Sequence, residues 1–219
     1  TLKNKSTLIQ FALFPLLAVV MTEVIAKGQQ DLGDHYFISL FSSMYAGFVP
    51  MLTLSSIIAE EKETHTLKML MMANVKPWQY LIGTGGYVFL ISALGSLAMG
   101  LVGGYAGWEL VRYMAVMLCG ITASMLLGAA VGIVSKNQMT SVAAVMPVAL
   151  VAGFMPMLAM FNDKFEAVSR ILYTQQINYM IADISPANMG PTRFLVIVAN
   201  MLVFLAMLAV AYKRGNLSG

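Results

Sequence analysis

The sequence predicts an all-α integral membrane protein with six transmembrane helices. Hydrophobic residues make up 59% of the 219 residues and charged residues only 11%, whereas a soluble domain carries roughly a quarter charged residues. Six long stretches also lack Asp, Glu, Lys and Arg. A helix that crosses the hydrocarbon core needs about 20 mostly apolar residues, and each stretch comes close to or exceeds that length. Water is therefore not the main solvent around this chain.

The expected spans follow one another as a single transmembrane domain over residues 1–219. They cover residues 6–26, 36–59, 77–107, 113–135, 138–161 and 193–212. With six spans both termini share one side, and that side holds eight of the 13 Lys and Arg residues. The positive-inside rule then places both termini on the cytoplasmic side of a cell membrane. The basic residues form no run, so we expect no nucleic-acid partner.

Residues 60–78 join the second and third spans on the expected cytoplasmic side. Thr64 is a candidate N-cap, residues 67–73 favour a helix, and Asn74 tolerates the left-handed conformation that ends one. This pattern predicts a short helix along the membrane face. The charge run that precedes it is equally typical of a solvated cap, with methionines that merely dip into the interface, as of a functional site, and the pattern does not separate the two.

The outer loop, residues 162–191, is less polar than a free loop. Four apolar residues recur at helical spacing opposite three charged ones, which predicts an amphipathic helix at the outer interface. A second apolar set, residues 177–184, indicates either an interfacial or partly re-entrant segment that roofs the spans or an ordinary helix on the lipid surface. The first set is Phe165, Val168, Ile171 and Leu172, opposite Lys164, Glu166 and Arg170.

Small residues recur every four positions in the third and fourth spans. Lipid provides no hydrophobic driving force that brings helices together, so helices associate by close packing, and stripes of small residues let their backbones approach closely. They predict a close hairpin of these two helices, although a stripe could equally contact a second copy or a neighbouring helix. The candidate packing residues are Ser96, Gly100 and Gly104 in one span and Gly120, Ser124, Gly128 and Gly132 in the other.

The sequence carries no pattern of an enzyme. It has no phosphate-binding loop of the G-x-x-x-x-G-K-[ST] type and no His and Cys spacing for a metal. The spans also lack the ionisable residues that ion-driven carriers place at mid-membrane. We therefore expect no catalytic residue, metal or cofactor on this chain, and any energy for transport must come from a partner.

The loop after the second span resembles that of type-2 ABC exporter permeases. The matching residues are Glu61-Lys62-Glu63-Thr64-His65-Thr66-Leu67, then Leu70-Met71, Val75 and Trp78, together with Phe14-Pro15-Leu16-Leu17 in the first span. The family usually has a glycine where this chain has His65. The resemblance extends to the six spans with cytoplasmic ends.

The resemblance implies that the loop helix is a coupling helix seated in a groove of a separate ABC ATPase subunit, which binds ATP and Mg. Glu61 and Glu63 would contact or orient toward that subunit, while Thr66, Leu67 and Leu70 would form the seated face. A second permease chain, identical or different, would complete the path through the lipid.

The many methionines and aromatics in the spans suggest a hydrophobic or amphipathic cargo, such as a drug, an antimicrobial peptide or a lipid. These side chains could instead simply face lipid. The alternative function is a membrane-embedded sensor or immunity protein that binds a peptide or partner without pumping.

Overall fold

The computed structural model describes residues 5–24 and 35–214. Within these two ranges the chain forms nine helices and no strand, which confirms the all-α class. The helices are α1 (Lys5–Val24), α2 (Tyr36–Glu63), α3 (Thr66–Met72), α4 (Pro77–Val102), α5 (Gly107–Val134), α6 (Gln138–Ala159), α7 (Asp163–Ser169), α8 (Tyr173–Ala182) and α9 (Pro191–Arg214).

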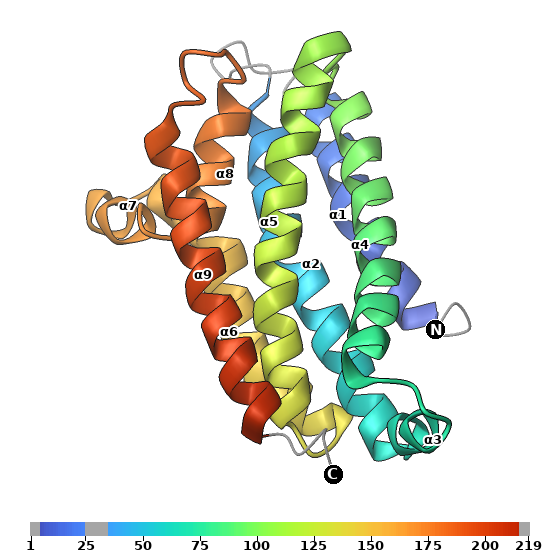
Figure 1. Cartoon of the computed structure of the whole chain (residues 1–219). Helices are drawn as coiled ribbons and strands as arrows, with labels where there is room; N and C mark the ends of the chain where they lie inside the picture. Colours follow the sequence, from blue (N-terminus) through green and yellow to red (C-terminus); the bar gives the residue numbers. More distant parts are fainter. Residues whose placement is uncertain (1–4, 25–34, 215–219) are drawn as a thin grey trace.

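The long helices run side by side, with the short helix α3 at one end and α8 in the opposite half of the bundle (Figure 1). By length and composition, five of the described helices can cross a membrane: α2, α4, α5, α6 and α9. The apolar stretch of α1, Phe11–Val24, is shorter, and residues 25 and 26 of the first expected span lie outside the described residues. The fold is therefore that of an integral membrane protein.

The termini themselves, residues 1–4 and 215–219, also lie outside the described residues. The first described residues of α1 and the last of α9 fall in the half of the bundle that carries α3 (Figure 1). This arrangement is the one that six crossings require, because an even number returns the chain to the side on which it started.

Helix α2 is the centre of the bundle. It packs against α1, α4, α5, α6 and α8 and is buried along most of its length, whereas α9 packs mainly on α5 and leaves most of its surface exposed. The exposed residues of α9 are largely apolar, as a face toward lipid requires. The core therefore forms around α2, and α9 lies at the lipid boundary.

The turn between α4 and α5 comes earlier than the charges suggested. Helix α4 ends at Val102 rather than at residue 107, and α5 begins at Gly107 rather than at residue 113. Gly104 and Gly107 adopt φ angles of +76° and +55°, in the left-handed region that favours glycine. Glu109 lies in the first turn of α5, where an acidic side chain suits the helix dipole. A charged residue therefore did not mark the helix boundary here.

The small residues of α5 contact α2 and α8 rather than α4. The Ser124 hydroxyl donates a hydrogen bond to the Ala46 carbonyl of α2. A Cβ atom on Gly128 would lie 3.0 Å from the Met51 Cα, and one on Gly132 would lie 2.8 Å from the Ser55 carbonyl oxygen. A Cβ on Gly120 would collide with the Ile177 side chain of α8. The α5 stripe thus serves a neighbouring helix other than its hairpin partner.

Helices α4 and α5 still form a hairpin, but large side chains of α5 fill its interface. A Cβ on Gly100 would lie 2.8 Å from the Tyr113 ring, and the Ser96 hydroxyl is 3.8 Å from the Met114 sulfur. Gly104 is not a packing residue, because it lies in the turn and nothing lies within 4 Å of the position of its Cβ. The expectation for Gly104 was wrong, since its spacing continues the stripe beyond the end of the helix.

Candidate functional site

The short helix α3 lies at one end of the bundle, between the ends of α2 and α4 (Figure 1). Thr64 is the C-cap of α2 rather than the N-cap of α3: its backbone N–H donates to the Glu60 carbonyl at 2.9 Å and its hydroxyl to the same oxygen at 3.0 Å. His65 then turns the chain with a φ of +58°, and Asn74 has a φ of +69° after α3 ends. Asn74 therefore adopts the expected left-handed conformation, and His65 does so where the resembling family has glycine.

Lys62 and Glu63, at the end of α2, bind the facing ends of α5 and α6. The Lys62 ammonium donates hydrogen bonds to the carbonyls of Ile133 and Ser135, the latter at 2.7 Å. The Glu63 carboxylate accepts from the backbone N–H of Gln138, the first residue of α6, at 3.0 Å. A cation thus meets the carboxyl end of one helix and an anion the amino end of the next, and both match the helix dipoles.

Two further hydrogen bonds tie the start of α6 to α2. The Gln138 side-chain amide donates to the Ser56 hydroxyl at 2.8 Å, and the Ser141 hydroxyl donates to the Ser55 carbonyl at 3.0 Å. Glu61 is half-buried and lies near Tyr80 of α4. The hydrogen bonds of Lys62 and Glu63 therefore connect the end of α2 to α5 and α6. We call Lys62 and Glu63 the helix-end clamp.

The residues expected to seat α3 in a partner instead hold it on this chain. Leu67 is only 4% exposed, and Leu70 packs against the same core while Thr66 is half-buried. A helix of seven residues has few apolar side chains with which to hold its position, so this face is used internally. The opposite face exposes Lys68, Met69 and Met72, with Met69 56% and Met72 72% exposed.

Sequence reasoning missed both the clamp and the free face of α3. The partners of Lys62 are more than 70 positions away in the chain, and no local pattern shows such pairs. The apolar stripe of Leu67 and Leu70 was visible in the sequence, but a stripe does not state which body covers it. The exposed methionines were the available signal for the other face.

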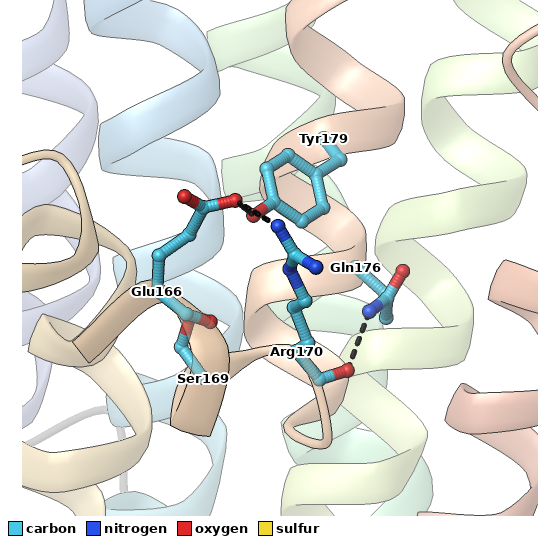
Figure 2. Close-up of polar contacts among 5 residues, drawn as sticks. All are labelled: Glu166, Ser169, Arg170, Gln176 and Tyr179. Carbon is cyan, nitrogen blue, oxygen red and sulfur yellow. Dashed lines mark hydrogen bonds and ion pairs between the residues drawn. The ribbon is translucent and has the colours of Figure 1, made fainter. Parts of the chain in front are cut away.

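At the other half of the bundle, α7 and α8 are joined by a group of polar contacts. The Glu166 carboxylate accepts hydrogen bonds from the Arg170 guanidinium and from the Tyr179 hydroxyl, both at 2.9 Å (Figure 2). Asn162 caps the start of α7 by accepting from the Lys164 N–H at 2.9 Å. The hydrogen bonds from Arg170 and Tyr179 hold the pKa of Glu166 below its usual value, so the pair stays ionised and mutually neutralised.

The break between α7 and α8 has its carbonyls satisfied by side chains. The Gln176 amide donates to the Arg170 carbonyl at 2.6 Å (Figure 2), and the Asn200 amide of α9 donates to the Ile171 carbonyl at 2.9 Å. Helix α8 itself is buried against α2, α5, α6 and α9. Irregular backbone is tolerated at membrane depth only where protein covers it, and α8 is a buried segment rather than a helix on the lipid surface.

Taken together, these features define a multi-pass membrane protein with a short helix presented at one end of its bundle. Among the described residues, no group of His, Cys, Asp and Glu could hold a metal ion. Over residues 3–213 the sequence matches the family described as ABC-2 family transporter protein. The match covers nearly the whole chain, so the chain belongs to this family and the resemblance is confirmed. A search of curated proteins finds no match.

Family membership makes the chain a membrane-embedded permease subunit of an ABC transporter. Subunits of this family serve transport, and an ABC ATPase is their general partner. The helix α3 lies in the loop by which the sequence resembles this family.

Proposed function

We propose that the chain is the permease subunit of an exporter in which α3 receives the motion of a separate ATPase that binds ATP and Mg. The observation that carries this proposal is the free face of α3. Lys68, Met69 and Met72 are exposed at the end of the bundle, and Leu67 on the opposite face fixes α3 to the chain. In this proposal the contact with the ATPase is made by the exposed face.

The helix-end clamp gives the received motion a route into the membrane. A displacement of α3 moves the end of α2, to which α3 is joined by only two residues. Lys62 then carries the displacement to the end of α5, and Glu63 carries it to the start of α6. Helices move as rigid elements in such transitions, so one input reaches several spans. Glu63 thus acts within this chain rather than as a direct contact to the ATPase, and Glu61 is half-buried at the same helix end.

The cargo and the assembly follow the same proposal. The end of the bundle that carries α3 faces the cytoplasm, and the cargo moves from the cytoplasmic side of the membrane to the outer side. A second permease chain, identical or different, encloses the path with this one. The apolar character of the spans supports a hydrophobic or amphipathic cargo, such as a drug, an antimicrobial peptide or a lipid.

The test is reconstitution of the permease with a candidate ABC ATPase subunit, measuring copurification and cargo-stimulated ATP hydrolysis. Met69→Asp places a charge on the exposed face of α3, and we expect it to lower both readouts by at least about tenfold. Met139→Asp is the matched control, because Met139 is 82% exposed at the same end of the bundle but lies on α6. Full activity of Met69→Asp, or equal loss in both variants, would contradict the role of α3.

The same preparation tests the cargo and the direction. Inside-out vesicles should accumulate an amphipathic peptide when ATP is added, and stronger stimulation by a polar sugar polymer would overturn the proposed cargo class. Copurification of the two proteins without ATP-driven movement of any cargo would favour the membrane sensor or immunity function. Leu67→Asp is unsuited to this assay, because it places a charge at a buried position and is expected to unfold α3.

A further inference from the structure

A groove with a volume of about 500 Å³ lies between α5 and α9 on the outer surface of the bundle. Ala130 and Val131 of α5 form one wall. The other wall is a single stripe of α9, because its members recur three or four positions apart. These are Val203, Ala206, Met207, Val210, Ala211 and Arg214. The guanidinium of Arg214 is the one charged group among the described residues that line the groove.

The length of the groove corresponds to one leaflet of a membrane. Val203 and Arg214 are separated by 11 residue steps, which is about 16 Å at a rise of about 1.5 Å per residue. The hydrocarbon core is about 30 Å thick, so one leaflet accounts for about 15 Å. The apolar part of the groove thus spans one leaflet, and Arg214 lies at the level of the headgroups, in the half of the bundle that carries α3 (Figure 1).

The width of the groove limits what can occupy it. A volume of about 500 Å³ over about 16 Å gives a mean cross-section of about 31 Å², or about 6 Å across. An α-helix with its side chains is about 10–12 Å wide, so a helix of a second copy would cover the groove and insert only side chains into it. A single hydrocarbon chain fits along its whole length, and the small Ala130 and Ala206 side chains leave the space for it.

We propose that this groove binds one acyl chain of an anionic phospholipid, with the headgroup phosphate on Arg214. A guanidinium binds a phosphate through two parallel hydrogen bonds, and basic residues at the ends of membrane helices bind anionic headgroups. The headgroup of a zwitterionic lipid carries a cationic group as well as the phosphate, and this cation would be repelled by Arg214. An anionic phospholipid lacks that repulsion and is therefore favoured. Lys213 is the neighbouring cation in the last turn of α9, but it does not line the groove.

The experiment measures lipid retained on the purified full chain by native mass spectrometry. The chain is exchanged into mixed micelles of phosphatidylglycerol and phosphatidylcholine with identical acyl chains. The wild type should retain phosphatidylglycerol in excess. Arg214→Gln should lower that retention about tenfold, whereas Lys213→Gln, which removes the same charge one residue away, should change it less than about twofold. Equal retention of the two lipids, or equal effects of the two variants, overturns the proposal.

A second pair of variants tests the apolar part of the groove. Ala206→Phe fills it, while Ala209→Phe adds the same ring to an exposed position of α9 outside it. Ala206→Phe should lower retention of both lipids and Ala209→Phe of neither, with unchanged unfolding midpoints in both. If Ala206→Phe leaves lipid retention unchanged but alters the oligomeric state, the groove is a contact between copies and the proposal is wrong.

Discussion

Removing the Lys62 ammonium should weaken the junction of α2, α5 and α6. Lys62→Met keeps the aliphatic stem and deletes only the charged donor. The variant then loses the two hydrogen bonds to the carbonyls of Ile133 and Ser135, along with the favourable charge at the carboxyl end of α5. The end of α5 would be left with carbonyls that have no side-chain partner.

The size of the effect follows from these contacts. A hydrogen bond to a charged group contributes about 1.5–3 kcal/mol, and two such bonds are lost. Lys62 is half-buried, so water reaches the freed carbonyls and replaces part of each bond. We therefore expect a loss of about 2 kcal/mol in the free energy of unfolding, close to the value for one bond rather than two.

The assay is equilibrium unfolding of the purified protein in mixed micelles. Lys68→Met is the control, because it removes the same charge from an exposed position on α3, and surface substitutions of this kind change stability by less than about 0.5 kcal/mol. If Lys62→Met and Lys68→Met unfold at the same denaturant concentration, Lys62 does not hold these helix ends together.

Three further predictions use the same unfolding measurement. His65→Gly should stabilise the protein by up to about 1 kcal/mol, since φ at residue 65 is +58°; no gain would mean that the residue is unstrained. Gly128→Ala should destabilise by about 2 kcal/mol because its Cβ meets the backbone of α2, whereas Gly83→Ala, with nothing within 4 Å, should not. Glu166 has a lowered pKa owing to Arg170 and Tyr179, so the stability that its ionised form contributes is present above pH 4.5 and is lost as the pH falls below that value. Glu166→Gln should flatten this dependence of the unfolding midpoint on pH. An unchanged dependence would show that the contacts of Glu166 do not stabilise the protein.

The existence of the helices could be predicted from the sequence because length and apolar content alone decide whether a helix can cross a membrane. The short helix α3 could be predicted as well, since Asn74 supplies the conformation that ends it. The turn after α4 was misplaced because Glu109 and Arg112 were taken to lie outside the helix. Charged residues extend helices beyond the apolar core without ending them, and the glycines at 103 and 104 were the better signal.

Which faces meet could not be predicted. Small residues permit a close approach in lipid, but they do not name the partner, and the α5 stripe contacts α2 instead of α4. The same limit applies to the clamp, because Lys62 and Glu63 look like solvated charges until residues 133–138 are brought beside them. Hydrogen bonds between residues this far apart in the chain follow from the tertiary fold and not from any local propensity.

The contacts of α2 also connect the two ends of the molecule. At one end the clamp joins α2 to α5 and α6. Farther along, α2 meets α6 and α8 at Gly47, where an added Cβ would lie 2.8 Å from a methyl of Thr174 and 3.1 Å from the backbone of α6. Helices whose backbones pack this closely resist independent movement. In the proposed exporter, a displacement of α2 at the α3 end is therefore expected to shift α8 as well, which gives this buried segment a mechanical connection to the ATPase.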